Sequence, residues 1–277
     1  MSAILLERAM YQRRARQPLA PSGSDPARLT AAFGDYLGRH LARATQGLSR
    51  EYAPDHYLCS TMIDLPFSSG ALDWHRLRER IGQHTAHVPQ TLVNAYECAS
   101  WGYVLRHVTC HRPLPTRLLC TIVDVNLLNL GYWEQNSNWG KSGFGVITLA
   151  LHCPVASEAA IVAGFAKTHN AVAEFALAMR QAVRAAPGRK LAKPFFPEDI
   201  TGLFLRQLPD ADHLPDDHPE LGHCFGADPW ISIIRDARGK RTDGHYLSAS
   251  TALNGYWALA QVDTVPDGEY LFADEAP

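Results

Sequence analysis

The stretch VNAYECASWGYVL, residues 93–105, places one cysteine between a short apolar segment and a run of residues with helical spacing. The residues before Cys98 are typical of a buried strand, and those after it are typical of a helix. A thiol at such a junction meets the positive end of the helix dipole, which favours the thiolate and lowers the cysteine pKa. Cys98 is therefore a candidate nucleophile. The alternative is that it fills the core as a small apolar residue.

The composition is that of a compact globular protein without a basic surface. The chain has 277 residues, of which 46% are hydrophobic and 19% are charged, and its formal net charge is -2. This charge provides no positive field for nucleic acid, so small-molecule or protein partners are expected. The sequence contains neither a bilayer-spanning apolar stretch nor the charge order of a signal peptide. We therefore expect a cytoplasmic protein with no nucleic-acid or membrane partner.

The six cysteines, at positions 59, 98, 110, 120, 153 and 224, are expected to be free thiols in a reducing compartment. They form no CxxC pair, and no histidine and cysteine group has the spacing of a zinc site. The segment 208–243 is rich in proline, aspartate and histidine, but its spacing is typical of turns rather than of metal ligands. We expect no metal and no cofactor.

Strands and helices alternate along the chain. Strands are predicted over residues 3–10, 55–67, 90–97, 117–128, 139–154, 199–207 and 268–274. Helices are predicted over residues 25–48, 73–82, 157–186 and 250–262, and from Cys98 onward. An irregular excursion is expected within 208–243. The second half repeats the order of the first, which predicts a layered α/β protein of two similar halves.

A second stretch, GHYLSAST at residues 244–251, sets His245 in a glycine turn ahead of several small residues. A nucleophile and a base on corresponding elements of two similar halves can meet as a Cys–His pair. His245 is therefore the candidate base for Cys98. The alternative is an ordinary turn or surface histidine.

These stretches resemble the motifs of the thiolase superfamily, in particular those of the ketoacyl synthase III-like condensing enzymes. NAYECASWGYVL is similar to the nucleophile motif D-x-x-x-A-C-x-G-F, with Asn94 in place of the aspartate and Gly102 displaced by one residue. GHYLSAST is similar to G-H-P-L-G-A-S-G, with His245 on the histidine. Residues 138–151, NWGKSGFGVITLAL, are similar to F-G-D-G-A-G-A-V-V-L, with Lys141 replacing the aspartate.

The resemblance implies a five-layer α/β fold of two similar βαβαβαββ halves. Residues 1–154 would carry the nucleophile, and residues 155–277 would carry the catalytic histidine. The second half is expected to be truncated, because the chain stops after GEYLFADEAP where relatives continue through a glycine-rich loop and a last strand. Relatives dimerise, so a homodimer or a heterodimer with another thiolase-fold subunit is expected.

The resemblance also implies the chemistry. Cys98 would take an acyl group from coenzyme A or acyl carrier protein, and His245 would move the proton as general base and then acid. His223, in GHCFGADPW, is the candidate for the family's third catalytic residue, with a turn histidine as the alternative. Four aromatic residues are candidates for the wall of the acyl tunnel, with ordinary core packing as the alternative: Tyr96, Trp101, Trp133 and Trp139.

The expected function is that of an acyltransferase or condensing enzyme in polyketide, fatty-acid-like or other secondary metabolism. Residues 199–207 offer neither histidine nor asparagine where the family has its third residue, which favours acyl transfer over decarboxylation of a malonyl extender. Two alternatives remain open. One is a non-catalytic thiolase-fold subunit that pairs with a full-length ketoacyl synthase, and the other is a ligand-binding protein with an incidental thiol.

Overall fold

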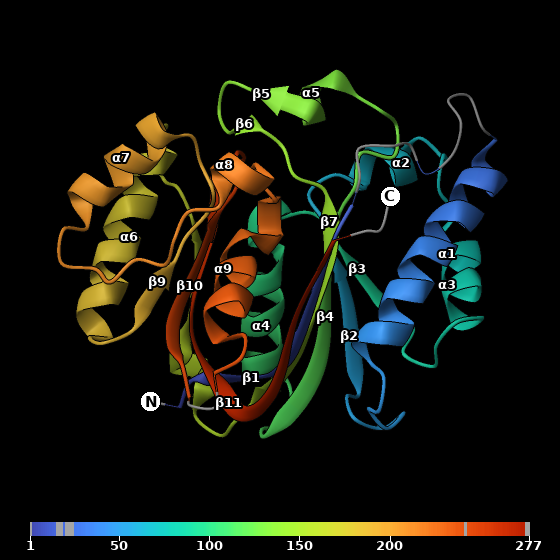
Figure 1. Cartoon of the computed structure of the whole chain (residues 1–277), viewed down its shortest axis with the longest axis horizontal. Helices are drawn as coiled ribbons and strands as arrows, with labels where there is room; N and C mark the ends of the chain where they lie inside the picture. Colours follow the sequence, from blue (N-terminus) through green and yellow to red (C-terminus); the bar gives the residue numbers. More distant parts are fainter. Residues whose placement is uncertain (1, 15–18, 20–24, 241–242, 275–277) are drawn as a thin grey trace.

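A computed structural model describes residues 2–14, 19, 25–240 and 243–274, and it shows helices and sheets in alternating layers (Figure 1). The three helix layers, from one side of the molecule to the other, are α1 (Pro26–Ala44) with α3 (Trp74–Gly82), α4 (Ser100–His111) with α9 (Asp228–Ala237), and α6 (Ala171–Ala185) with α7 (Glu198–Gln207). A β layer lies between each two, so the predicted five-layer α/β architecture is confirmed. Within the described ranges, none of the helices has the length and apolar character to cross a membrane.

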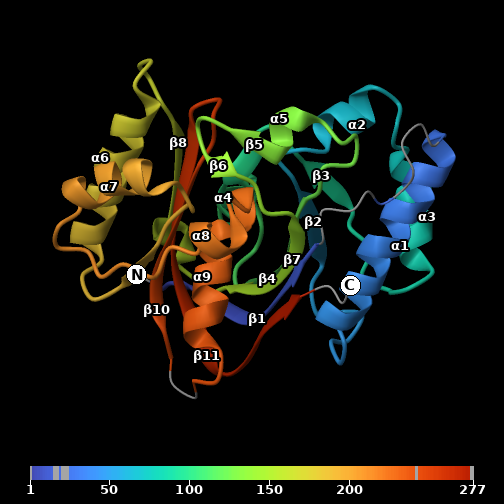
Figure 2. The ribbon, with the colours of Figure 1, turned by 45° about the horizontal axis from the view of Figure 1, so that its top comes forward.

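The strands of both β layers are hydrogen-bonded into one nine-stranded sheet, in the order β3-β2-β4-β7-β1-β11-β10-β9 with β8 pairing with β11. The strands are β1 (Ile4–Arg13), β2 (Asp55–Cys59), β3 (Thr91–Val93), β4 (Thr116–Asp124), β7 (Gly145–Cys153), β8 (Ile161–Phe165), β9 (Lys190–Ala192), β10 (His245–Thr251) and β11 (Tyr256–Asp274). β1 and β11 run parallel and join the two parts of the sheet (Figure 2). These parts are called below the first sheet (β3, β2, β4, β7 and β1) and the second sheet (β11, β10, β9 and β8). The sheet therefore encloses the central helices α4 and α9 on two sides.

The two halves share one topology. In the first half the elements follow the predicted βαβαβαββ order, and its strands, numbered within the half, lie in the order 3-2-4-5-1. In the second half, β9, β10, β11 and β8 correspond to strands 2, 4, 5 and 1, and they lie in that order. Where a third strand would lie, the described residues form only an isolated parallel bridge between Leu191 and His213. The second half is thus the smaller one, and the predicted division at residue 154 stays a prediction.

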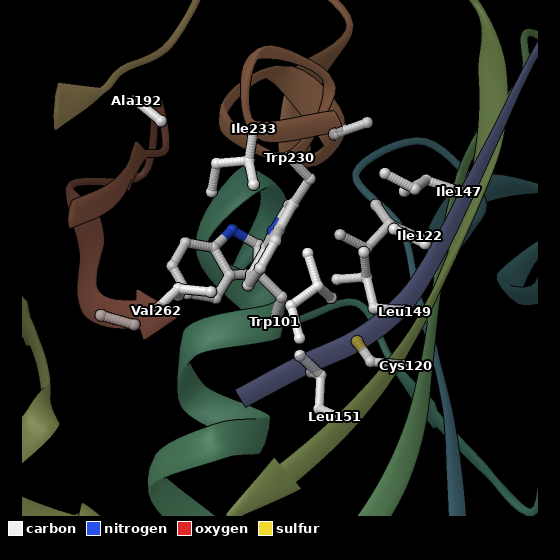
Figure 3. Close-up of a cluster of buried hydrophobic side chains, with 14 of the residues drawn as sticks. Trp101, Cys120, Ile122, Ile147, Leu149, Leu151, Ala192, Trp230, Ile233 and Val262 are labelled. Atoms are coloured by element: carbon white, nitrogen blue, oxygen red, sulfur yellow. The ribbon is translucent and has the colours of Figure 1, made fainter. Parts of the chain in front are cut away.

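Three hydrophobic cores fill the spaces between the layers. Leu58, Val123 and Val146 of the first sheet pack against α1 and α3, and Leu247 and Leu259 of the second sheet pack against α6 and α7. The central core joins both sheets to the central helices, and Figure 3 shows Trp101 of α4 against Trp230 of α9. The two indole rings meet edge to face, with ring centroids 5.0 Å apart and an interplanar angle of 82°. Both central helices are therefore buried between the sheets.

Two of the predicted elements have the wrong secondary structure. Residues 199–207, predicted as a strand, form helix α7, whose first turn carries Glu198 and Asp199, the charge that a helix amino terminus favours. Residues 250–262, predicted as a helix, form the end of β10, a turn and the start of β11. Leu259 faces the outer core and Ala258 the central core, so both faces of this strand are buried. An apolar run without polar alternation does not distinguish a buried strand from a helix.

The helix predicted over 157–186 is also only partly correct. Helix α6 begins at Ala171, where the side chain of Asn170 accepts a hydrogen bond from the amide of Ala173. The residues before it form a short 3-10 turn and then β8, which pairs antiparallel with β11. Within the segment 208–243, α9 interrupts the expected irregular excursion, because its apolar residues fill the space between the two sheets.

Buried polar side chains form a chain of hydrogen bonds across the first sheet, on the side of α1. His40 Nε2 lies 3.0 Å from Thr148 Oγ1, Thr148 Oγ1 lies 2.9 Å from Thr121 Oγ1, and Thr121 Oγ1 lies 2.9 Å from His56 Nε2. Burial lowers the pKa of His40 and the pKa of His56 to about 3. Both imidazoles are therefore neutral in the folded protein at physiological pH.

These histidines predict a pH-dependent stability. The unfolded chain binds protons at a pKa near 6.5, whereas the folded chain binds them near 3, so acid favours unfolding across this window. We expect each histidine to remove about 2 kcal/mol of unfolding free energy between pH 7.5 and pH 5. The destabilisation caused by His56→Gln should therefore be smaller at pH 5 than at pH 7.5 by about that amount. Urea unfolding at both pH values measures it, and equal destabilisation at the two pH values contradicts the assignment.

Helix α4 packs directly onto β11 because the contact consists of two small residues. A Cβ atom built on Gly102 would lie 2.1 Å from the Cβ atom of Ala258, far inside van der Waals contact. Any side chain at Gly102 would push α4 away from the sheet, and Cys98 stands immediately before this helix. The position of Cys98 therefore depends on this glycine.

We expect Gly102→Ala to lower the unfolding free energy by about 1–3 kcal/mol through overpacking, although alanine has the higher helix propensity. Gly202→Ala in α7 is the matched control, since no atom lies within 4 Å of a Cβ built there, and it should be neutral or stabilising. Adding Ala258→Gly to Gly102→Ala should restore part of the loss. Chemical denaturation measures all four proteins, and a stable Gly102→Ala variant would show that α4 is not held this tightly.

Candidate active site

Cys98 and His223 both lie close to the start of a central helix, one in each half. Cys98 lies in a 3-10 turn (Glu97–Ala99) that leads into α4, and His223 comes just before a 3-10 turn (Phe225–Ala227) that leads into α9. The two turns meet at Gly226, where an added Cβ would lie 3.3 Å from the carbonyl oxygen of Cys98. The paired central helices therefore present one thiol and one imidazole to each other.

The thiol of Cys98 has two polar neighbours. His223 Nε2 lies 4.0 Å from Cys98 Sγ, and Thr61 Oγ1 donates a hydrogen bond to the same sulfur at 3.6 Å. Cys98 and His223 are both buried. The structure thus brings together a thiol and an imidazole from different halves of the chain, the two groups that a Cys–His pair requires.

The other side of the imidazole ring fixes its tautomer. His223 Nδ1 lies 2.9 Å from the carbonyl oxygen of Phe195 and 2.7 Å from Asp228 Oδ2. Both neighbours are acceptors, so Nδ1 carries a proton, and in the neutral imidazole the lone pair would then be on Nε2, the atom that faces Cys98. Asp228 is itself held by the amides of Phe195 and Cys224, at 2.9 Å and 2.6 Å. The carboxylate is therefore placed to stabilise an imidazolium at His223.

The expected low pKa of Cys98 is wrong. Burial raises the pKa of the Cys98 thiol well above its usual value, and the negative charge of Asp124 adds to the effect. The single 3-10 turn ahead of α4 does not offset these contributions. Cys98 is therefore a thiol at neutral pH, and a nucleophilic role would require transfer of its proton to a base such as His223.

Asp124 sits at the end of β4 and organises the loop that touches the sulfur. Its Oδ1 accepts hydrogen bonds from the amide of Thr61 at 2.7 Å and from Ser60 Oγ at 3.2 Å. Burial raises the pKa of Asp124 to about 6. The carboxyl group thereby holds Thr61 in position to donate to Cys98.

A largely apolar cavity of about 300 Å³ opens onto Cys98 and His223. Trp133 and Trp139, both predicted as wall residues, line it from the segment that contains α5 (Gly131–Glu134), β5 (Gln135–Asn136) and β6 (Gly140–Lys141). The opposite wall comes from the second half, through Val172, Phe196, Ile200, Leu203 and Phe204. The cavity therefore lies between the two halves.

The other two aromatic candidates lie outside this cavity. Tyr96 stacks on Tyr103, with ring centroids 3.9 Å apart, and lines a separate outer groove. Trp101 is buried in the central core, where its Nε1 donates to Ser250 Oγ at 2.9 Å. Both are among the four residues predicted as candidates for the tunnel wall. On the helix that follows Cys98, Trp101 points into the core instead.

His245 is not a neighbour of Cys98. It is exposed at the first residue of β10, with its Nδ1 3.0 Å from Asp263 Oδ1. The cavity is lined by Thr251, at the opposite end of the same strand. Six residues of strand span about 20 Å. The predicted pairing of Cys98 with His245 is therefore not formed, and His223 lies where His245 was expected.

Three residues around Cys98 and His223 were missed in the sequence: Thr61, Asp124 and Asp228. Thr61 follows strand β2, and Asp124 is the last residue of strand β4. These two strands are parallel, so their carboxyl ends meet at one edge of the sheet. Polar residues at such ends are a general sign of a site in α/β sheets. Asp228 was missed because an Asp-Pro pair is also typical of a helix start, and α9 does begin at Asp228.

The buried thiol predicts slow alkylation. Only the thiolate reacts with iodoacetamide, so at pH 8 Cys98 should react at least roughly ten times more slowly than the exposed Cys110. Asp124→Asn should speed the reaction of Cys98, because it removes a negative charge that raises the pKa of the thiol. Asp64→Asn, at an exposed position, is the control. Peptide mass spectrometry measures each site, and equal rates at Cys98 and Cys110 in the wild type contradict a raised pKa.

No family sequence model and no curated protein sequence matches the chain. Several solved structures, however, are similar to this chain. A tetronic acid condensing enzyme superposes with a TM-score of 0.58 at 13% identity, over 92% of this chain and 99% of that one. A protein described as an acyltransferase gives a TM-score of 0.63 at 11% identity, over 94% of this chain and 97% of that one.

The 3-oxoacyl-(acyl carrier protein) synthase III of Pseudomonas aeruginosa PAO1 gives a TM-score of 0.57 at 13% identity, over 94% of this chain and 98% of that one. Because these superpositions span nearly the whole length of the similar structures, the predicted truncation of the second half is not confirmed. The chain therefore has the thiolase-like fold, in the form that the ketoacyl synthase III-like condensing enzymes have.

Proposed function

We propose that this protein is a condensing or acyl-transferring enzyme that carries its acyl group on Cys98. The observation that supports this most directly is the contact between Cys98 and His223, with the imidazole tautomer fixed by Phe195 and Asp228. The similar structures include a condensing enzyme, a ketoacyl synthase III and a protein described as an acyltransferase, which agrees with thioester chemistry.

In the first step, Cys98 Sγ attacks the carbonyl carbon of an acyl thioester. The proton of the thiol passes to His223 Nε2, the new carbon–sulfur bond forms, and the thiol of the carrier leaves with that proton. Asp228 stabilises the imidazolium that exists between these two events, since it lies 2.7 Å from His223 Nδ1. Thr61, which donates to the sulfur, stabilises the charge that develops there.

The apolar cavity supports an apolar acyl group as the cargo. Its walls are aromatic and aliphatic side chains of both halves, and burying apolar surface there stabilises the bound chain by about 25 cal/mol per Å². The donor in this proposal is a thioester of acyl carrier protein or of coenzyme A, and the thioester is a substrate rather than a cofactor. Pairing with a second thiolase-fold subunit, as a homodimer or heterodimer, also remains part of the proposal.

Acyl loading tests the proposal. After mixing with octanoyl-coenzyme A, the mass of the intact protein should rise by one octanoyl group, and Cys98→Ala should abolish the increase. His223→Asn should slow loading roughly 10²- to 10⁴-fold, the usual contribution of a general base. His245→Asn is the matched control and should load like the wild type, because His245 lies at the far end of β10.

Two results contradict the assignment. Loading that persists in Cys98→Ala places the acyl group elsewhere, and loading that is slowed by His245→Asn but not by His223→Asn places the base elsewhere. If no octanoyl, acetyl or malonyl donor, on coenzyme A or on a carrier protein, loads the wild type, the protein is a non-catalytic subunit or a binding protein.

A further inference from the structure

Glu97, the residue immediately before Cys98, has no part in the steps described so far. It is half-buried, and its backbone φ of 46° lies in the left-handed region that residues other than glycine rarely adopt. The surrounding structure thus holds a carboxylate beside the nucleophile in spite of an unfavourable backbone conformation. The free-energy cost of this backbone conformation must be offset by contacts that Glu97 makes, or the conformation must serve a function.

The hydrogen bonds of Glu97 involve only one of its two carboxylate oxygens. Oε2 accepts hydrogen bonds from the amides of Leu253 and Asn254, at 2.9 Å and 3.4 Å, in the turn between β10 and β11. Oε1 accepts no hydrogen bond from any residue that the structure describes. One oxygen therefore ties the nucleophile turn to the second half, and the other keeps its hydrogen-bonding capacity.

Glu97 also lies in the shared wall of two cavities, both of which are lined by Thr61, Glu97, Tyr132 and Trp133. It lines the apolar cavity that contains Cys98 and His223, and it lines a second cavity of about 560 Å³. The polar residues of this second cavity include Asp64, Asn94 and Asn254. A molecule bound in the polar cavity would therefore lie beside Glu97, the residue that immediately precedes Cys98.

The charged side chains that line these two cavities are acidic. Glu97 is the only Asp, Glu, Lys or Arg among the described residues that line the apolar cavity, and the second cavity adds only Asp64. No lysine or arginine lines either cavity among those residues. An anionic group brought to Cys98 would therefore meet a carboxylate and no lysine or arginine among these residues, whereas a hydroxyl or an ammonium group could donate to Glu97.

We propose that Glu97 is a specificity-determining residue that restricts the second substrate to a neutral or cationic acyl acceptor, a hydroxyl or an amine, and disfavours an anionic malonyl-type thioester. The inference rests on the proposed function, because it needs an acyl group on Cys98. It selects acyl transfer over decarboxylative condensation. The acceptor oxygen or nitrogen forms the bond to the acyl carbon, the bond to Cys98 Sγ breaks, and the acceptor proton passes through His223 to the departing sulfur.

A competition experiment tests this assignment. The protein is loaded with octanoyl-N-acetylcysteamine and then offered equal concentrations of 2-aminoethanol and malonyl-N-acetylcysteamine. Mass spectrometry measures octanoyl transfer against the 3-oxodecanoyl condensation product. The wild type should favour transfer. Glu97→Gln, which keeps an oxygen for the amides of Leu253 and Asn254, should raise the ratio of condensation to transfer about 10- to 100-fold.

Two further variants separate charge from structure. Glu97→Asp keeps the negative charge with a shorter reach, and it should retain the preference of the wild type. Glu51→Gln changes an exposed glutamate that lines neither cavity, and it should change nothing. A ratio in Glu97→Gln within two-fold of the wild type overturns the assignment, as does a wild type that condenses as readily as it transfers.

A binding measurement with the wild type keeps the assignment testable if Glu97→Gln does not fold. Malonyl-N-acetylcysteamine and its neutral carboxamide analogue are compared as inhibitors of octanoyl loading. The carboxamide should bind at least about 10-fold more tightly, because it does not face Glu97 with a second negative charge. Equal affinities overturn the role of Glu97. Failure of Cys98 to accept octanoyl at all instead overturns the proposed function, and with it the acceptor assignment.

Discussion

The candidate site depends on how two buried helices pack between two parts of one sheet. α4 and α9 meet through the edge-to-face contact of Trp101 and Trp230, in a core shared by strands of both halves. Cys98 precedes one of these helices and His223 precedes the other. A thiol and an imidazole from distant parts of the sequence are therefore positioned by apolar packing, before any polar contact between them is considered. The small pair Gly102 and Ala258 sets how closely α4 can approach β11.

Burial also sets the chemistry of the pair. An isolated thiolate is costly in a low-dielectric site, and the neighbouring carboxylates Asp124, Glu97 and Asp228 make it costlier still. The resting state of Cys98 is consequently the neutral thiol. If the thiol gives its proton to His223, Asp228 lies in position to stabilise the imidazolium. In the proposed function, the same negative surroundings that keep Cys98 protonated also bear on which second substrate approaches it.

Local patterns predicted the first half better than the second. The strands near residues 3–10 and 117–128 and the helices near 25–48 and 73–82 are all present, because each has one dominant period or a clear cap. In the second half, β8 and the start of β11 lie where helices were expected. Small residues such as Ala258 and Ala260 face one core while larger ones face another, so the apolar run has no polar face to mark its period.

The sequence by itself determined that the protein is a layered α/β chain, that Cys98 stands where a strand gives way to a helix, and that Trp133 and Trp139 are near it. These conclusions follow from local periodicity, junctions and motif likeness. Which histidine meets Cys98 was decided only by the tertiary structure. His223 and His245 both follow a glycine, but one precedes a central helix and the other begins a strand whose far end reaches the cavity. Strand direction and helix packing act over distances that a motif of eight residues does not encode.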